Sequence, residues 1–489
     1  MNWTMMSALV VYLVGVYLLG YYSWAFVARA RAGTGAGFMR EYFISGRDLG
    51  GFVLAMTLVA TYVSAGSFIG GPGTAYTQGL GWVFLAMAQM PTGYLTLALL
   101  GKRFAILARK INAVTIVDYL KARYESDLVV ILASISIVAF LMASMTAQWV
   151  GAARVLQAVG MSYELGLAIF AITLLIYVTV GGFRAVALTD ALQGMVMLVG
   201  TIAIIIGAVS AGGGVENIVR TMYKTNPDLI TPFGVKNFIS VPWVSSFWVL
   251  VGIGLVGLPQ IAVRAMAYRD SKAMHRAIII GTPVAGFLML GMHLVGAFGA
   301  AVVPGIKAGD LVVPTVTTKV LPEWLAGMFL AGPLAAIMST VDSMLILVAS
   351  SIVKDIWLNY VNPKMSDRGI ANMSTIVTII VGVVVYVTAL KPPPLLVWLN
   401  LFAIAGLEAT FFWPILLGLY WRRANAPGAI ASMLAGVGSY LYFDQVILWK
   451  KPLGMHTVVL PLILALVAFV VVSCVTRKPS REIEEKFWA

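Results

Sequence analysis

Two long apolar stretches of this chain are interrupted by glycine and proline. One covers residues 58–73 (LVATYVSAGSFIGGPG) and the other covers residues 248–264 (WVLVGIGLVGLPQIAVR). Each lies in a run long enough to cross a bilayer, where an interrupted helix leaves unpaired backbone N–H and C=O groups at a cost of several kcal/mol each. Interruptions of this kind persist where they line a cavity, and a matched pair in two halves of a chain indicates the binding site of a transporter.

Composition places the whole chain in the membrane. Hydrophobic residues make up 60% of the 489 and charged residues 11%, and apolar runs of roughly 20 residues recur throughout. We therefore predict an all-α polytopic membrane protein with about 13 transmembrane helices and no separate soluble domain. The predicted spans are 3–27, 49–75, 80–101, 127–150, 162–181, 186–209, 243–263, 277–303, 323–348, 370–389, 395–420, 427–448 and 453–475.

The distribution of positive charge predicts the orientation. With the N-terminus outside, 24 of the 33 lysines and arginines fall on the cytoplasmic side and 9 outside. This agrees with the positive-inside rule, and the C-terminus is then cytoplasmic. The net charge of +13 is thereby explained without nucleic acid. The first apolar run has no preceding basic region, so we interpret it as a retained helix.

The two interrupted spans are the second and the seventh, and they cross in opposite directions. Spans 2–6 and 7–11 then form two five-helix halves of inverted orientation. The predicted units are a first helix with its cytoplasmic loop (1–48), the first repeat with an external loop (49–242), the second repeat (243–426), and two last spans with a short tail (427–489). Arg264 is predicted to mark the cytoplasmic end of the seventh span.

A candidate cation site lies in the ninth span. Ala336, Ser339 and Thr340 have i, i+3, i+4 spacing and share one helix face, which Ser343 extends. Their hydroxyl and carbonyl oxygens suit a small hard cation. The alternative is close helix packing, for which small and hydroxyl residues are also used. Asp342 lies about 120° away on the helix and is not expected to share the ion.

Other polar groups within apolar spans are candidates for function. Tyr62, Ser64 and Ser67 add side-chain oxygens beside the first interruption. Asp190 either serves function or caps a helix start, and Glu408 either serves function or pairs with a buried cation. A mid-span His293 more often packs with a hydrogen bond than binds a ligand.

The sequence contains no motif of an enzyme or an ATP-driven pump. It has no P-loop, no zinc-type Cys/His spacing and no nucleotide-binding domain. The remaining classes are a transporter driven by an ion gradient, a channel, or a membrane-bound sensor. The 15 residues after Cys474 are too few for a sensor's output domain.

Several motifs resemble the solute:sodium symporter family. They are YVTVGGFRA (177–185) followed by Thr189, Asp190 and Gln193, AAIMSTVDSML (335–345), and GLYWRRANAPGA (418–429) with Gly436. Further stretches are similar to the pantothenate-transporting branch of that family. They are 41–82, SFWVL (246–250), DSKAMHR (270–276) and WLNLFAIAGLEATFFW (398–413).

The resemblance implies a LeuT-like fold and sodium-coupled uptake. It assigns the principal sodium site to the backbone carbonyls of Ala60, Val63 and Ala336 and the hydroxyls of Ser339 and Thr340. It also ties Asp190 to a second sodium site or to the ion's release path. Sodium is then the coupling ion, and no cofactor, nucleic acid or obligate protein partner is expected.

The expected substrate is pantothenate, imported by alternating access across the bilayer of a bacterial inner membrane. The apolar surroundings of residues 252–260 suit a gem-dimethyl group and a carboxylate better than a hexose. The candidate substrate-binding residues are Tyr62, Ser64, Ser67, Gln260, Asn400 and Glu408. The alternative within the family is another small carboxylate or an amino acid such as proline, and a channel or a sensor is the alternative outside it.

Overall fold

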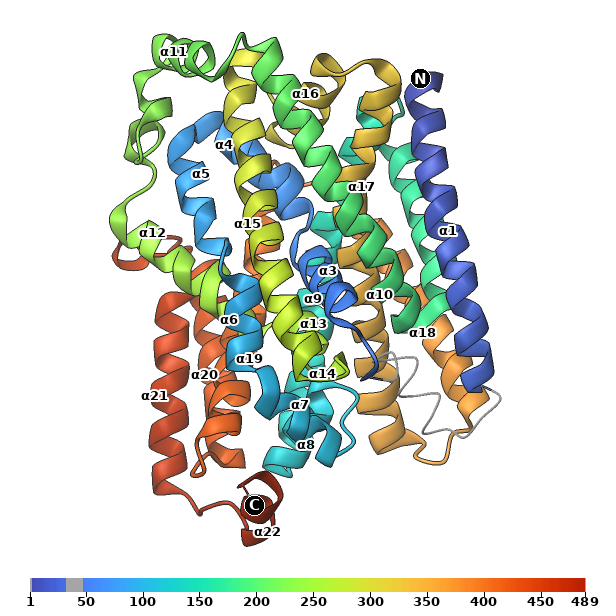
Figure 1. Cartoon of the computed structure of the whole chain (residues 1–489). Coiled ribbons are helices and arrows are strands. Elements are labelled where there is room, and N and C mark those ends of the chain that lie inside the picture. The colour runs from blue at the N-terminus through green and yellow to red at the C-terminus, as the bar shows by residue number, and fades with distance from the viewer. Residues whose placement is uncertain (1, 32–46, 489) are drawn as a thin grey trace.

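The computed structural model describes residues 2–31 and 47–488, and in these residues it is helical without a named strand (Figure 1). The α-helices are α1 (Trp3–Arg31), α3 (Gly51–Tyr62), α4 (Gly71–Gln78), α5 (Leu80–Ala86), α6 (Thr92–Leu99), α7 (Gly101–Lys110), α8 (Ile116–Tyr124), α9 (Asp127–Ala158), α10 (Tyr163–Ala211), α11 (Val215–Thr225), α12 (Val241–Phe247), α13 (Pro259–Ala262), α14 (Arg264–Ala267), α15 (Ser271–Val302), α16 (Val312–Val320), α17 (Glu323–Ser350), α18 (Asp367–Ala389), α19 (Leu396–Tyr420), α20 (Ala426–Leu441), α21 (Val459–Val475) and α22 (Arg481–Trp488). The π-helical segments are Gly66–Gly70, Trp248–Ile253, Ser351–Val361 and Tyr442–Val446, and the 3₁₀ segments are Met87–Gln89, Pro227–Ile230, Val235–Asn237, Gly254–Gly257, Gly309–Leu311 and Pro452–Gly454.

Length and apolar composition identify 7 membrane-crossing helices among the described residues, or up to 9 if each bent pair counts as one. The thirteen-span count and the unit boundaries stay predictions. Most of the first predicted cytoplasmic loop, and part of the 41–82 stretch, lie outside the described residues. The side chains of 179–185, in one of the family motifs, are also outside them.

Helix α10 is too long for a single crossing. Its 49 residues would span about 74 Å if straight, against roughly 30 Å of hydrocarbon. Near its start, the Tyr163 hydroxyl donates to the carbonyl oxygen of Ala389 at 2.6 Å, at the end of α18. Near its end, a Cβ on Gly207 would lie 2.7 Å from the Val320 side chain, just before α17. Because α17 and α18 are consecutive and packed together, both ends of α10 lie on one face of the bundle, and α10 crosses twice.

That face is called the N-terminal face below. It also holds the start of the chain, because a Cβ on Gly327, near the start of α17, would lie 2.4 Å from the carbonyl oxygen of Met5. Several helices begin with a polar side chain that accepts a hydrogen bond from a backbone amide in the first turn, which stabilises a helix start. These residues are Ser126, Ser162, Asp270, Ser366 and Asn425.

Helix α17 is the centre of the bundle. Every residue from 330 to 350 is buried, and α17 packs against α1, α3, α9, α10 and α18. A helix that is apolar on all sides is expected in such a position. The hydroxyl-bearing residues of α17 therefore face other helices, and their neighbours decide what they do.

The two interrupted spans are bent where glycine and proline predict it. The first comprises α3, the π-helical turn Gly66–Gly70 and α4, with a bend of 63°. Val63, directly after α3, is extended at φ −72° and ψ 117°. The second runs from α12 to α14 with a bend of 56°, and Leu258 is extended there at φ −86° and ψ 116°. Extended residues free carbonyl oxygens within the bundle, and both bends lie beside α17 or α19.

Candidate functional site

The first interruption and α17 bring five oxygen atoms together, which we call the oxygen cluster. They are the carbonyl oxygens of Ala60, Val63 and Ala336 and the hydroxyl oxygens of Ser339 and Thr340. The first two come from the unwinding end of α3 and the other three from one face of α17. All five residues are at most 1% exposed.

The distances within the oxygen cluster are short. The Ser339 hydroxyl lies 2.8 Å from the Ala60 carbonyl oxygen and 3.1 Å from that of Ala336. The Thr340 hydroxyl lies 3.2 Å from the Val63 oxygen and 2.9 Å from the Ala336 oxygen. The cluster contains only neutral oxygens, the ligand type that hard cations of low charge prefer.

Two further groups lie near the oxygen cluster. The carbonyl oxygen of Thr61 also lies 3.3 Å from the Thr340 hydroxyl, a neighbour that the sequence did not single out. Asp342 is fully buried on α17, and its Oδ1 accepts a hydrogen bond from the Ser343 hydroxyl at 3.3 Å. The carboxylate thus contacts Ser343, one turn along α17 from the oxygen cluster.

A second cluster surrounds a buried arginine. Arg264 Nη2 donates to Asp190 Oδ2 at 3.1 Å and to the Ser343 hydroxyl at 2.7 Å. Its Nε donates to the carbonyl oxygen of Thr57 at 3.1 Å, and its Nη1 to that of Gln260 at 2.7 Å. The Thr57 hydroxyl in turn donates to Asp190 Oδ2 at 2.5 Å. We call these five residues the Arg264 cluster.

Arg264 lies in the last helical turn of the second interrupted span, near the end that the sequence predicts, and it is buried there. Arg264 and Asp190 are both 0% exposed, because α13 and α14 continue the second interrupted span into the bundle. A buried charge is retained where it is paired and hydrogen-bonded, since an unpaired one costs several kcal/mol. In this conformation the Asp190 carboxylate is thus paired with a guanidinium.

A small central cavity of about 40 Å³ lies beside the first interruption. Four of the six candidate substrate residues line it, namely Tyr62, Ser64, Ser67 and Asn400. Gln89 lines it too, and its Oε1 accepts a hydrogen bond from the Tyr62 hydroxyl at 2.6 Å. The apolar part of the wall includes aromatic and branched aliphatic side chains, among them Trp82, Phe247, Val251 and Ile404.

Gln148 ties the interruption to α19. Its Oε1 accepts a hydrogen bond from the backbone N–H of Ala65 at 2.7 Å, and its Nε2 donates to Asn400 Oδ1 at 3.1 Å. Ser144 donates to the same Asn400 oxygen at 2.9 Å. The Asn400 carboxamide is therefore held in one orientation at the edge of the cavity.

His293 also lines the cavity. Its Nδ1 lies 2.7 Å from the carbonyl oxygen of Met289, one turn earlier in α15. The other ring nitrogen approaches Gly71 so closely that a Cβ there would lie 2.3 Å from it. Glycine at position 71, at the start of α4, thus lets His293 approach the first interruption. The sequence predicted a hydrogen-bonded packing role for His293 and did not predict this contact.

Glu408 and Gln260 lie outside the central cavity. Glu408 is fully buried, and a Cβ on Gly254 would lie 2.6 Å from its carboxyl carbon. In the described part of the chain neither Glu408 carboxyl oxygen has a hydrogen-bond partner. Gln260 contributes its backbone carbonyl oxygen to the Arg264 cluster. Gln260 therefore belongs to the second interruption, Glu408 of α19 packs against it, and neither residue lines the central cavity.

Reasoning from sequence missed Gln89, Gln148 and Arg264. The first two are neutral amides that lie outside the interruptions and outside the motifs of the family resemblance, where amide side chains were not considered. An intramembrane amide must also find hydrogen-bond partners, so the same search extended to glutamine would have found both.

The chain is similar to known proteins over most of its length. The pattern of the sodium:solute symporter family matches residues 42–436. The chain is 50% identical over 465 residues to the sodium/pantothenate symporter of Escherichia coli (strain K12), with 95% of each chain covered. It is 47% identical over 474 residues to that of Haemophilus influenzae, with 96% of each covered.

The fold is similar to that of a sodium-coupled sialic acid symporter solved in a substrate-bound outward-open state. The TM-score is 0.79 at 19% identity, over 98% of this chain and 99% of that one. This likeness confirms the predicted LeuT-like, all-helical fold. With the match over most of the sequence, it follows that the chain belongs to the sodium:solute symporter family.

Proposed function

We propose that this chain imports pantothenate together with sodium across a bacterial inner membrane. The observation that carries the proposal is the oxygen cluster, which joins the interruption of one span to the centre of α17. Two relatives about half identical to this chain are named for the same pair of solutes. Sodium serves as the coupling ion, and the lipid bilayer as the surroundings.

Sodium is held by the carbonyl oxygens of Ala60 and Val63 on α3 and by the α17 oxygens of Ala336, Ser339 and Thr340. Each hydroxyl can turn its hydrogen away and offer a lone pair to the ion. The bound ion would then link α3 to α17. Since the same interruption borders the central cavity, sodium binding would order the wall that meets the organic solute.

Pantothenate occupies the central cavity after the cavity has widened. Tyr62, Ser64, Ser67 and Asn400 supply hydrogen bonds to its hydroxyl and amide groups. The helix restarts at Gly66 on the wall of the central cavity, and the positive end of its dipole there favours the carboxylate of pantothenate. Phe247 and its aliphatic neighbours suit the gem-dimethyl group. We assign Glu408 to the packing around the second interruption and not to the binding of pantothenate.

One sodium ion accompanies each pantothenate anion. The oxygen cluster has no charged protein group, whereas the Asp190 carboxylate, the other candidate ligand, is paired with the Arg264 guanidinium. The Arg264 guanidinium therefore competes with a second sodium ion for the Asp190 carboxylate. Transport of one monovalent cation with one monovalent anion moves no net charge.

Uptake into proteoliposomes tests the function. We expect purified protein to accumulate radiolabelled pantothenate when a sodium gradient is directed inward, and not when potassium replaces sodium. Excess unlabelled pantothenate should block the tracer, whereas proline and glucose should not. Block by proline would favour the amino-acid alternative, and accumulation without sodium would contradict the coupling.

The N-terminus is placed outside and the C-terminus in the cytoplasm. In a variant without Cys474, a cysteine at Lys224 should react with an impermeant thiol reagent added from outside. A cysteine at Arg368 should react from the cytoplasmic side. Reaction of both from the same side would contradict this orientation.

A further inference from the structure

Glu408 is a buried carboxyl group that the proposed function does not use. It lies in the middle of α19 and is 0% exposed. Within the described residues, neither of its carboxyl oxygens has a hydrogen-bond partner. The ion pairs at or below 4.0 Å in that part of the chain do not include Glu408 either. Glu408 is thus isolated, and no buried cation of the described chain neutralises it.

The protonation state of Glu408 follows from this isolation. A neutral polar group that is buried without a hydrogen bond costs roughly 2–7 kcal/mol, and an isolated carboxylate costs far more, so such a group takes up a proton instead. The contrast with Asp190 is direct, because the Arg264 guanidinium and the Thr57 hydroxyl both donate to that carboxylate. In this conformation Glu408 therefore carries a proton.

The second interruption packs directly on the Glu408 carboxyl group. Its 3₁₀ segment, Gly254–Gly257, lies against α19. A Cβ on Gly254 would lie 2.6 Å from the carboxyl carbon, and a Cβ on Gly257 would lie 3.0 Å from the backbone nitrogen of Phe412. Two glycines thus let the backbone of the interrupted span approach α19 closely. A hydrated metal ion needs more space than this contact leaves, whereas a proton fits.

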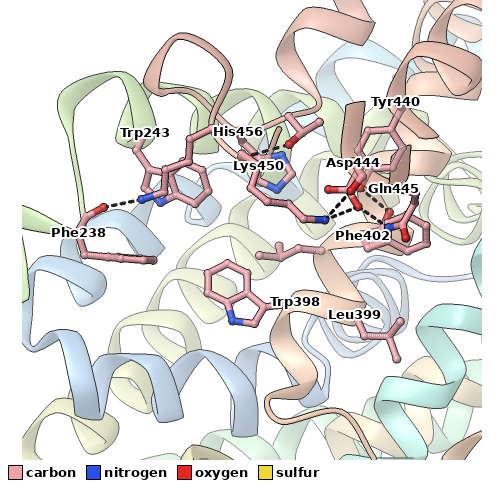
Figure 2. A pocket seen from close by; sticks show the side chains of 13 residues that line it. Phe238, Trp243, Trp398, Leu399, Phe402, Tyr440, Asp444, Gln445, Lys450 and His456 are labelled. Carbon is pink, nitrogen blue, oxygen red and sulfur yellow. Dashed lines mark hydrogen bonds and ion pairs between the residues drawn. The ribbon is translucent and has the colours of Figure 1, made fainter. Parts of the chain in front are cut away.

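A pocket of about 590 Å³ brings water toward this part of α19. It lies between α12, α19 and the segment that follows α20. This is the N-terminal face, because α18 ends there and α19 and α20 then cross to the other face and back. Tyr440 and Phe402 line the pocket together with Asp444 and Lys450 (Figure 2). The Lys450 side chain is 57% exposed, so the pocket reaches the surface.

Tyr440 connects this pocket to Glu408. Helix α20 packs on α19 beside Glu408, since a Cβ on Gly436, one turn before Tyr440, would lie 2.1 Å from the carbonyl oxygen of Ala409. Tyr440 is close enough to Glu408 for the two groups to interact electrostatically. Its hydroxyl donates to the carbonyl oxygen of Phe402 at 3.1 Å. A small movement of this tyrosine would let water from the pocket reach the carboxyl group.

The other elements packed on α19 bring no ionised side chain against Glu408 in the described chain. Tyr62 of the first interrupted span is the other titratable group that interacts with it. Helix α9 meets this part of α19 through Phe140, whose ring a Cβ on Gly406 would contact at 2.1 Å. No acid or base occurs in the packed segments 66–70, 248–257 and 459–473. The titratable residues of α8 contact residues 414–418 of α19 instead, and they are Tyr119, Arg123 and Tyr124.

We propose that Glu408 is a proton-binding site, filled from the N-terminal face, that controls how the second interrupted span packs on α19. With the proton bound, the span lies against α19 as it does here. When the proton leaves to water, the carboxyl group ionises and the span separates from it. The proton is bound and released at the same face, so it adds no charge to the solutes that cross.

Infrared difference spectroscopy of the purified protein in nanodiscs at neutral pH tests for the proton directly. The spectrum of the wild type minus that of Glu408→Gln should contain the C=O stretch of a neutral carboxylic acid. Glu216→Gln is the matched control, because the Glu216 side chain is 87% exposed and its difference spectrum should contain a carboxylate stretch alone. A carboxylate stretch alone for Glu408 as well would overturn the proposal.

Uptake by right-side-out membrane vesicles tests the link to transport. Because packing of the span binds a proton, a rise in outer pH opposes packing. Sodium-driven uptake should therefore fall between about pH 6 and about pH 9, by at most about tenfold per pH unit for one proton. Pantothenate stays a monoanion over this range. Glu408→Gln, which is neutral at every pH, should remove the dependence, and Glu216→Gln should retain it.

Two outcomes of the vesicle experiment would contradict the site. One is the same pH profile in the wild type and in Glu408→Gln, and the other is a response to inner pH in place of outer pH. Glu408→Met, which is also uncharged, should reproduce the result of Glu408→Gln and serves if that variant does not fold. The infrared test does not depend on the transported solute. Absence of pantothenate uptake by the wild type would therefore contradict the proposed function and leave the proton site to be decided by the infrared bands.

Discussion

Helix α17 contributes to two polar clusters about one turn apart, and they differ in where the positive charge comes from. Around Ser339 and Thr340 the neighbours are neutral oxygens of the first interruption. Around Ser343 the neighbour is the guanidinium of Arg264, 2.7 Å away, which also pairs with Asp190. One cluster is suited to receive a cation, and the other already contains one.

The two clusters differ because a different interrupted span packs on α17 at each of them, and not because α17 itself differs. Hydroxyl residues at i and i+4 look alike in the sequence. The first interruption directs carbonyl oxygens toward one of them, and the second interruption directs an arginine toward the other. Polar residues within a membrane helix thus take their role from the chain that packs on them.

The largest effect is expected for Arg264→Met. It leaves the buried Asp190 carboxylate without its cation, which for buried pairs costs about 3–5 kcal/mol of stability. The free energy of unfolding, measured by chemical denaturation in detergent, should fall by that amount. Arg269→Met is the matched control, because the Arg269 side chain is 63% exposed and should change stability little.

The double variant Arg264→Met with Asp190→Leu sharpens this prediction. Removal of both charges should recover much of the lost stability, since apolar residues often replace a buried ion pair without penalty. A single Arg264→Met variant as stable as the wild type would show that the ion pair does not hold the second interruption in place.

The next largest effect is expected for Thr340→Ala. It removes one oxygen of the oxygen cluster, with a loss of about 1.5–3 kcal/mol, or roughly ten- to hundredfold in affinity. The sodium concentration for half-maximal uptake should rise accordingly, and Ser339→Ala should act in the same direction. Thr378→Ala is the control, because the buried Thr378 hydroxyl bonds to the carbonyl oxygen of Ser374 in its own helix. Unchanged sodium dependence in Thr340→Ala would refute the sodium site.

The sequence was sufficient to predict the interruptions and the helix face of the oxygen cluster. Glycine and proline within an apolar span mark a bend wherever it lies in the fold, and i, i+4 spacing places Ala336 and Thr340 on one face in any helix. These features depend on local geometry alone, so they need no knowledge of neighbouring helices.

The roles of Arg264, Gln260 and Glu408 could not be predicted in the same way. Hydropathy ends the seventh span before Arg264, whereas the bend carries α13 and α14 back into the protein. Helix α19 is apolar on all sides, so no polar face indicates the direction in which Glu408 points. Which cavity a side chain enters then depends on the packing of distant segments.

A smaller effect is expected for Asp342→Asn. The Asp342 carboxylate contacts Ser343 at 3.3 Å and so lies toward the Arg264 cluster. We expect the sodium concentration for half-maximal uptake to change about fivefold or less, well below the effect of Thr340→Ala in the same vesicles. An equal effect of the two substitutions would mean that the two clusters act as a single ion site.

The smallest effect is expected from membrane voltage. If Arg264 prevents a second sodium from using Asp190, one sodium and one pantothenate anion cross together without net charge. An inside-negative potential of about 100 mV, imposed with potassium and valinomycin, should then change steady-state accumulation less than about twofold. A second sodium would add about 2.3 kcal/mol per 100 mV, or roughly fiftyfold. Accumulation that rises toward that value would show that sodium reaches Asp190 during the cycle, and that the contrast between the two clusters holds for one conformation alone.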